Sequence, residues 1–153
     1  MKILSTNKKA FFNFEILEKF EAGISLTGQE VKSIKTSGVS LAGTYVVPKK
    51  NKKGKTEFFW VGANIPPYQP ENVVNFNPQR ERKILLHKKE ISYLLGKTQQ
   101  KGLTLVPLRI YNKKGWLKLE IGLARGKKKR EKKELLKKRA IEKEIERALK
   151  EKR

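Results

Sequence analysis

The sequence contains no cysteine and no aspartate, and its single histidine is His87. Without cysteine, the 153-residue chain has no disulfide framework, no thiol nucleophile and no Cys-ligated zinc site. Without aspartate it cannot form a Ser/His/Asp triad, and its glutamates are scattered among lysines rather than clustered as metal ligands. The phosphate-binding motifs GxxxxGKS, GxxxxGKT and GxGxxG are also missing. We therefore expect that the protein is not an enzyme and uses neither a metal nor a cofactor.

Long apolar runs are missing as well. No segment approaches the length of a membrane-spanning helix, and Met1–Thr6 is followed by Asn7-Lys8-Lys9 rather than by the apolar core of a signal peptide. The lack of cysteine fits a reducing compartment. We therefore expect a cytoplasmic protein that does not enter a membrane.

Positive charge is what the sequence has in excess. The 37 lysines and arginines and 15 glutamates give a net charge of +22 at pH 7, which indicates a polyanionic partner. Residues 127–153 hold 14 basic and 6 acidic residues, a net charge of +8, and the rest of the chain carries +14. The aromatic residues and all prolines lie before residue 127. This shift predicts two parts, a nucleic-acid-binding domain over residues 1–126 and a basic tail over residues 127–153.

The hydrophobic pattern of the first part predicts a mainly β domain. We expect residues 1–10 to be frayed, Gly23 to form a bulge or a bend within its strand, and residues 64–79, with four of the six prolines, to be irregular. Strands are expected at Phe11–Leu26, Leu41–Pro48, Glu57–Gly62, Leu103–Tyr111 and Trp116–Ala124. Helices are expected at Thr27–Lys35, with a capping box and a stop at Gly38, and at His87–Gln100. Five or six strands joined mostly by hairpins, with two or three short helices, predict a small antiparallel barrel.

The sequence of the tail predicts a helix that forms when the tail binds a partner. Ile141, Ile145 and Leu149 share one helical stripe, and the Glu134–Lys138 and Glu146–Lys150 pairs have favourable spacing. A single helix of about 20 residues with one thin stripe is marginal in water. We therefore expect the tail to become helical when it binds a polyanion.

Several residues allow both a structural and a functional interpretation. Glu21 and Glu30 are acids in a basic chain, so each is either a partner for a nearby cation or an acceptor for hydrogen bonds from RNA. The aromatic residues are expected in the core rather than as stacking platforms; they are Phe11, Phe12, Phe14, Trp60 and Tyr68. From the residues alone, the chain is a basic barrel that binds nucleic acid, and folded RNA is favoured over DNA for a barrel of this size. Two alternatives remain: a structural ribosomal protein, and a nonspecific single-strand RNA binder that stacks bases on Phe58-Phe59-Trp60.

A series of short blocks gives a more specific indication. The blocks are Asn7–Ala10, Phe20–Ile24, Gly28–Ile34, Gly62–Ile65, Asn77–Leu86, Gly102–Leu108 and Ile121–Lys128. In order and spacing they resemble the SsrA-binding protein (small protein B) family, from about Asn7 to Lys133. The Glu-Ala-Gly, Glu-Val-Lys-Ser and Gly-Lys-Lys blocks are specific in combination, although no single block is.

The resemblance implies a fold and a function. The family has an oligonucleotide-binding-like barrel that binds the tRNA-like domain of transfer-messenger RNA and delivers this RNA to stalled ribosomes for trans-translation. Its tail enters the small-subunit decoding region and the empty mRNA channel. The resemblance also implies that alanyl-tRNA synthetase and elongation factor Tu act on the same RNA, and that the protein is a monomer.

Site residues follow from the same resemblance. The residues expected to bind transfer-messenger RNA are Asn7, Lys8, Lys9, Glu21, Arg80, Arg82, Lys83 and Leu85. The residues expected to act on the ribosome are Gly126, Lys127, Lys128, Arg130, Glu131, Lys132 and Lys133. The family commonly has Tyr or His followed by Asp-Lys-Arg where this chain has Arg130-Glu131-Lys132-Lys133. The ring is lost there, and a planar guanidinium that can still stack on a base takes its place.

Overall fold

A long hairpin organises the fold of this protein, whose computed structural model describes residues 1–69, 76–127 and 129–151, without the side chains of 129–135, 150 and 151. The hairpin strands pair from Leu103 with Arg125 to Lys113 with Trp116. Between them, Lys114 and Gly115 have φ angles of 51° and 86°, the left-handed backbone that a two-residue hairpin turn requires. The strands expected at Leu103–Tyr111 and Trp116–Ala124 are therefore found as one hairpin with Lys113 and Lys114 at its tip.

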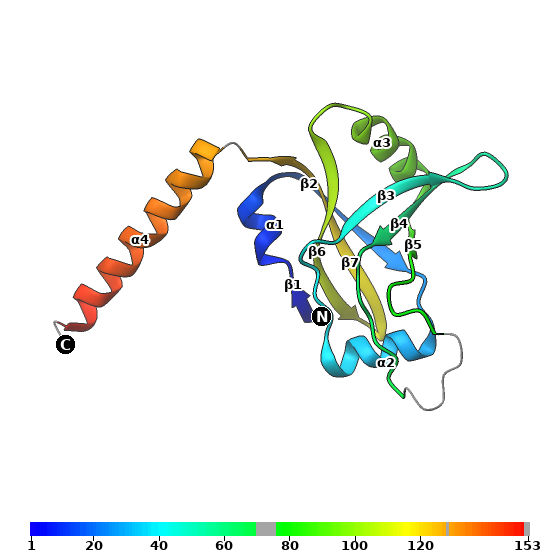
Figure 1. Ribbon diagram of the computed structural model, residues 1–153, viewed down its shortest axis with the longest axis horizontal. Coiled ribbons are helices and arrows are strands. Elements are labelled where there is room, and N and C mark those ends of the chain that lie inside the picture. The colour runs from blue at the N-terminus through cyan, green and yellow to red at the C-terminus, as the bar shows by residue number, and fades with distance from the viewer. Residues whose placement is uncertain (70–75, 128, 152–153) are drawn as a thin grey trace.

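Across the described residues the chain forms seven strands and four helices (Figure 1). In chain order they are β1 (Lys2–Thr6), α1 (Lys8–Asn13), β2 (Phe14–Ile24), α2 (Gly28–Ser37), β3 (Tyr45–Lys50), β4 (Thr56–Val61), β5 (Arg82–Leu85), α3 (Lys88–Thr98), β6 (Leu103–Lys113), β7 (Trp116–Gly126) and α4 (Lys129–Glu151). The strands pair antiparallel in the order β1-β6-β3-β4-β5-β2-β7, and β7 also pairs with β6. This last pairing closes six strands into a barrel and removes their free edges, with β1 beside β6 outside the ring. The predicted small antiparallel barrel is thus confirmed.

The interior of the barrel holds the main core. Fully buried side chains from the strands fill it, among them Phe58, Trp60 and Leu105. The helices α2 and α3 lie at opposite ends of the barrel in Figure 1 and contribute Ile34 and Leu94, both at 0% exposure. The two helices therefore close the ends that strand pairing leaves open.

A second, smaller core lies on the outer face of the barrel beneath α1. It contains Ala10, Val106, Leu108 and Ala124. Because α1 covers this face, β6 is buried on both faces here, and its sequence is a continuous apolar run instead of an alternating one. Gly122 keeps the strands close at this point, since a Cβ there would lie 2.9 Å from Leu108 Cδ1.

The N-terminal residues differ from the prediction. Residues 1–10 are ordered as β1 and the start of α1, and the chain from Phe11 to Asn13 is helical rather than extended. The physical reason is Asn7, whose side-chain oxygen accepts the N–H of Ala10 and so starts the helix. Of the bulge or bend predicted at Gly23, the bulge is wrong, because the register shift in the pairing of β2 with β7 lies between Ile16 and Glu18.

The predicted helices are found with their caps. Thr27 and Glu30 form the expected capping box, and Gly38 ends α2 with a φ of 72°. The tail is helical as α4, whereas its dependence on a polyanion stays a prediction. None of the described helices combines the length and the apolar character needed to cross a membrane.

Candidate nucleic-acid interface

Two groups of the predicted site residues lie on different sides of the barrel. The first group, here called the N-terminal surface, consists of Lys8, Lys9, Gly126 and Lys127. It lies on the side of the barrel that faces α4 in Figure 1. The second group, called the β2–β5 surface, consists of Glu21, Lys83 and Leu85; β5 and the end of β2 that pairs with it lie on the far side of the barrel from α4 in Figure 1.

Asn7 lies beneath the N-terminal surface. Its side chain is 4% exposed, and its Nδ2 donates to the carbonyl oxygens of Leu41 at 3.2 Å and Pro107 at 2.8 Å. Its Oδ1 accepts the Ala10 N–H at 3.1 Å. The polar atoms of Asn7 are therefore occupied within the protein, and this residue fixes α1 to β6 and to the turn before β3.

The beginning of the tail is attached to the other end of α1. The backbone N–H of Lys127 donates to Asn13 O at 2.9 Å, and its Nζ donates to Phe11 O at 3.2 Å. A lysine at a helix C-terminus satisfies carbonyls that have no partner within the helix and suits the negative end of its dipole. Further along, the Arg139 guanidinium of α4 lies 5.4 Å from the centre of the Phe12 ring. Residues more than 100 positions apart in the sequence thus meet at one surface.

Alternation along β2 and β5 creates the β2–β5 surface. Leu85 pairs with Gly23, so Leu85 and Glu21, two residues before Gly23, share the outer face. Leu85 is 52% exposed, so about half of its apolar side chain is open to solvent. Because Gly23 has no side chain, the Leu85 side chain can lie over it, and a Cβ at Gly23 would be 3.2 Å from Leu85 Cβ and 3.4 Å from Leu85 Cδ1.

Glu21 is held in a network of its own. The Tyr111 hydroxyl donates to Glu21 Oε2, and Lys113 Nζ lies 3.3 Å from the same oxygen. The Tyr111 hydrogen bond, followed by the nearby lysines Lys113 and Lys118, lowers the pKa of Glu21 despite partial burial. Burial and the Glu21 carboxylate raise the pKa of Tyr111. Glu21 is therefore an ionised, oriented hydrogen-bond acceptor that remains partly accessible from outside.

Arg82 requires a correction. The sequence placed it on the surface as an RNA contact, but its side chain is 0% exposed. On β5 the residues alternate between core and solvent, so Arg82 and Ile84 point inward while Lys83 and Leu85 point outward. Arg82 is thus buried by the register of its strand and cannot reach RNA from this position.

Glu30 of α2 is the partner that makes this burial possible. Arg82 Nε donates to Glu30 Oε2 at 2.7 Å, and the rest of its guanidinium donates to Ala63 O and Pro78 O at 2.8 and 2.9 Å. Burial alone would raise the pKa of Glu30, but the Thr27 N–H and the two guanidinium groups of Arg80 and Arg82 outweigh it and lower the pKa. Of the two interpretations of Glu30, the structure supports that of a local ion-pair partner.

The remaining predicted residues are partly accessible or undescribed. Arg80 is 40% exposed and donates to Glu30 Oε1 at 2.6 Å, and Lys83 is 47% exposed and lies 3.4 Å from Glu57 Oε2. Lys128 lies outside the described residues. The backbone of Arg130, Glu131, Lys132 and Lys133 belongs to α4, but their side chains are not described.

The structure adds residues that the sequence reasoning did not single out. Tyr111 and Lys113 are the partners of Glu21, and Trp116 is 73% exposed beside the basic hairpin tip. The position of Trp116 directly after Lys113-Lys114-Gly115, between two expected strands, could have indicated from the sequence that its side chain is exposed. Among the other aromatic residues, Phe58 and Trp60 are buried as core, whereas Tyr68 is 44% exposed and lies outside the core. Groups of three or more potential metal ligands do not occur in the part of the chain that the structure describes.

Comparisons with known proteins identify relatives of this chain. The family model described as SmpB protein matches residues 4–151. The SsrA-binding protein of Acaryochloris marina is 47% identical over 150 residues, which cover 97% of this chain and 94% of the relative. The SsrA-binding protein of Thermosipho melanesiensis is 48% identical over 151 residues, which cover 98% of this chain and 99% of the relative.

A solved structure matches the fold as well. It is described as "tmRNA-SmpB: a journey to the center of the bacterial ribosome", and it superposes with a TM-score of 0.64 at 45% sequence identity. The match covers 82% of this chain and 85% of the other. The sequence blocks, the closed barrel and these matches over nearly the whole length agree, and the chain belongs to the SmpB protein family.

Proposed function

We propose that this protein binds the tRNA-like domain of transfer-messenger RNA and delivers this RNA to stalled ribosomes for trans-translation. The observation that carries the proposal is 47% identity to an SsrA-binding protein over 97% of the chain. The exposed basic residues of the barrel and the basic tail support it physically, because lysine and arginine contacts to phosphates supply much of the affinity for nucleic acid.

The barrel and the tail take different tasks in this proposal. Exposed residues of the two surfaces contact the tRNA-like domain together with Arg80; they are Lys8, Lys9, Glu21, Lys83 and Leu85. Asn7 and Arg82 act indirectly, because they hold α1 and β5 in place. The tail, beginning at Gly126, enters the decoding region and the empty mRNA channel of the small subunit. Arg130 takes the place of the usual ring there and stacks through its guanidinium plane.

Further partners belong to the same proposal. Alanyl-tRNA synthetase and elongation factor Tu act on the RNA that this protein holds, and the protein works as a monomer in the cytoplasm, where ribosomes translate. It works by binding and performs no chemical step itself.

Two truncations test the division of tasks. Removal of the residues after Lys127 keeps the two hydrogen bonds from Lys127 to α1, whereas removal of the residues after Gly126 also deletes them. We expect both variants to bind transfer-messenger RNA nearly as tightly as the full chain and to fail in tagging stalled products in a reconstituted translation system. Loss of RNA affinity in the longer variant would contradict the proposed role of the tail.

A substitution of Glu21 tests recognition apart from charge. Glu21→Ala removes a negative charge, so plain electrostatics predicts tighter binding to every RNA. We expect weaker binding to the tRNA-like domain and unchanged or tighter binding to an unrelated duplex of equal length. Glu81→Ala serves as the matched control, because Glu81 pairs with Lys49 and its side chain is 48% exposed against 41% for Glu21. Weaker binding to both RNAs by Glu21→Ala would contradict a specific role.

The two alternatives make different predictions. A structural ribosomal protein would copurify with all ribosomes, and a nonspecific single-strand binder would copurify with a diffuse RNA population. The second alternative is disfavoured, because Phe58 and Trp60 are 1% and 0% exposed and cannot stack on bases. Sequencing of the RNA that copurifies with the protein distinguishes the proposal from both alternatives, since the proposal predicts one dominant tRNA-like species.

A further inference from the structure

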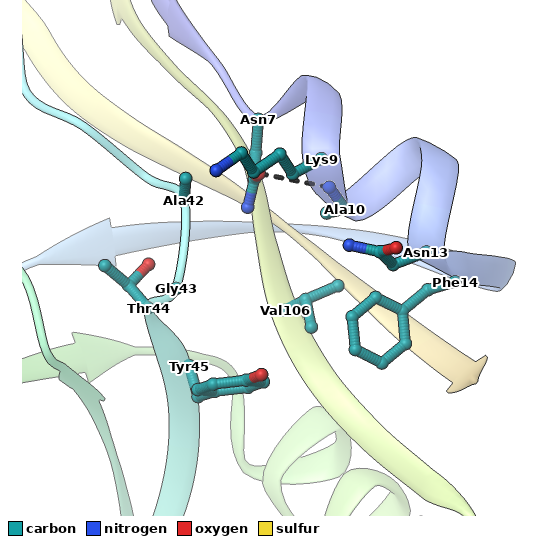
Figure 2. Close-up of a pocket in the computed structure, with 10 residues that line it drawn as sticks. All are labelled: Asn7, Lys9, Ala10, Asn13, Phe14, Ala42, Gly43, Thr44, Tyr45 and Val106. Atoms are coloured by element: carbon teal, nitrogen blue, oxygen red, sulfur yellow. Dashed lines mark hydrogen bonds between the residues drawn. The ribbon is translucent and has the colours of Figure 1, made fainter. Parts of the chain in front are cut away.

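A pocket opens between α1 and the turn that leads into β3. Its volume is about 300 Å³, at the lower end of the range for small-molecule sites. Figure 2 shows the rings of Phe14 and Tyr45 on either side of Val106, Asn13 beside Phe14, and Lys9 near Asn7 and Ala10. Gly43, whose φ is 76°, lies in the turn that leads to Tyr45.

The pocket presents polar groups without protein partners. Among the described residues, the side chains of Lys9, Asn13 and Tyr45 make no hydrogen bond or ion pair, although each lines the pocket. Asn7 and Thr44 differ, because their side chains already bond to backbone atoms. The free groups therefore provide one cation, one amide with both donor and acceptor, and one hydroxyl.

The walls are apolar and aromatic. Val106 and Ala10 are 1% and 5% exposed and belong to the small core under α1, so this part of the pocket is rigid. Tyr45 is 42% exposed and offers its ring to any group that enters. A planar group with two apolar faces and a polar edge matches such a site, because a face can stack on an aromatic ring while the edge forms hydrogen bonds with an amide.

The charge around the pocket selects an anionic ligand. Lys8 and Lys9 are exposed on α1, Lys127 lies at the other end of this helix, and no acidic residue is among those found to line the pocket. A nucleotide combines a planar ring with a negative phosphate, and single-stranded RNA is bound by this combination of aromatic rings and lysines.

We propose that this pocket binds one unstacked nucleobase of RNA. The base stacks on Tyr45, its edge bonds to the Asn13 amide, and Lys9 contacts the adjacent phosphate. This inference rests on the proposed RNA-binding function. The base comes either from transfer-messenger RNA or from the RNA of the small ribosomal subunit, and the pocket binds an extruded base in both cases.

Chemical footprinting of base edges, by dimethyl sulfate and a carbodiimide, tests the proposal in two arms. One arm uses the protein with purified transfer-messenger RNA, and the other uses it with purified small ribosomal subunits. We expect a base in one arm to be protected by the wild-type protein and by Tyr45→Phe, which keeps the ring. We expect Tyr45→Leu to lose this protection. Tyr68→Leu is the matched control, because Tyr68 is 44% exposed and lies outside the pocket.

Affinity provides a second measurement. Loss of one base–aromatic stack lowers affinity about 5- to 150-fold, so Tyr45→Leu should weaken binding by this factor in the arm that supplies the base. Asn13→Ala should lose the same protected base, and it covers the case in which Tyr45→Leu folds poorly. Identical footprints for Tyr45→Leu, Asn13→Ala and Tyr68→Leu in both arms would overturn the pocket while leaving the proposed function intact. Failure of the wild-type protein to bind either RNA would refute the proposed function and the pocket with it.

Discussion

Replacement of Glu30 by glutamine removes the charge from the buried centre that joins α2 to β5. Glu30 and Arg82 are both 0% exposed, and the Glu30 carboxylate accepts hydrogen bonds from Thr27 N, Arg80 and Arg82. The glutamine has nearly the same shape but only one acceptor oxygen. Its NH₂ group would therefore face a guanidinium, and the Arg82 charge would remain buried without a counter-ion.

The magnitude follows from this geometry. Removal of one partner from a buried ion pair costs about 3–5 kcal/mol, because the other charge is left without compensation. A domain of this kind has a total stability of roughly 5–15 kcal/mol, so the variant loses a large part of it. For a chain of this length, the melting temperature should fall by roughly 6–20 °C.

Urea unfolding followed by circular dichroism measures the effect at pH 7. Glu81→Gln is the matched control, since the Lys49–Glu81 pair is about half exposed and should contribute no more than about 1 kcal/mol. The difference between wild type and Glu30→Gln should also depend on pH. The folded-state pKa of Glu30 lies below its ordinary value of 4.5, so the contribution of its charge is complete above that pH and is lost as the pH falls further. A loss in Glu30→Gln no larger than that in Glu81→Gln would refute the reasoning.

Three further predictions concern packing, titration and the helix cap. Gly122→Ala should destabilise the protein by about 1–3 kcal/mol, because the new Cβ would lie 2.9 Å from Leu108 Cδ1. Gly96→Ala, in open space on α3, should instead raise the unfolding free energy by up to about 1 kcal/mol, and equal effects in urea unfolding would contradict the packing argument. Absorbance titration should show Tyr111 ionising well above the ordinary tyrosine value of 10.0, and Glu21→Gln should bring this step to lower pH; an unchanged curve would exclude the hydrogen bond. Asn7→Ala should lower stability by about 1–3 kcal/mol while the folded variant keeps its RNA affinity, whereas the opposite pattern would make Asn7 a direct contact.

Local signals in the sequence predicted most elements of the fold. The Thr27–Glu30 capping box begins α2 because both partners lie within one helical turn, and Lys114-Gly115 forms a turn because its backbone geometry is local. The N-terminal segment was missed because its order depends on distant partners. Asn7 starts α1 while bonding to Pro107 and Leu41, and no local pattern reveals such contacts.

For the candidate site, too, some features follow from the sequence and others depend on contacts between distant segments. Composition by itself determined that the protein is basic, without cysteine or aspartate, and therefore suited to bind a polyanion, because net charge needs no folding to exist. Only the tertiary structure decided where each charge lies. In the segment Arg80-Glu81-Arg82-Lys83, the register of β5 turns Lys83 toward solvent and Arg82 into the core. There the Glu30 carboxylate of α2 pairs with the Arg82 guanidinium. Strand closure brought Lys9 of α1 and Tyr45 of β3 to the same pocket and joined Lys127 to Phe11. Burial and proximity depend on contacts between segments far apart in the chain. For that reason the sequence identified the charged residues but not where each of them lies in the folded protein.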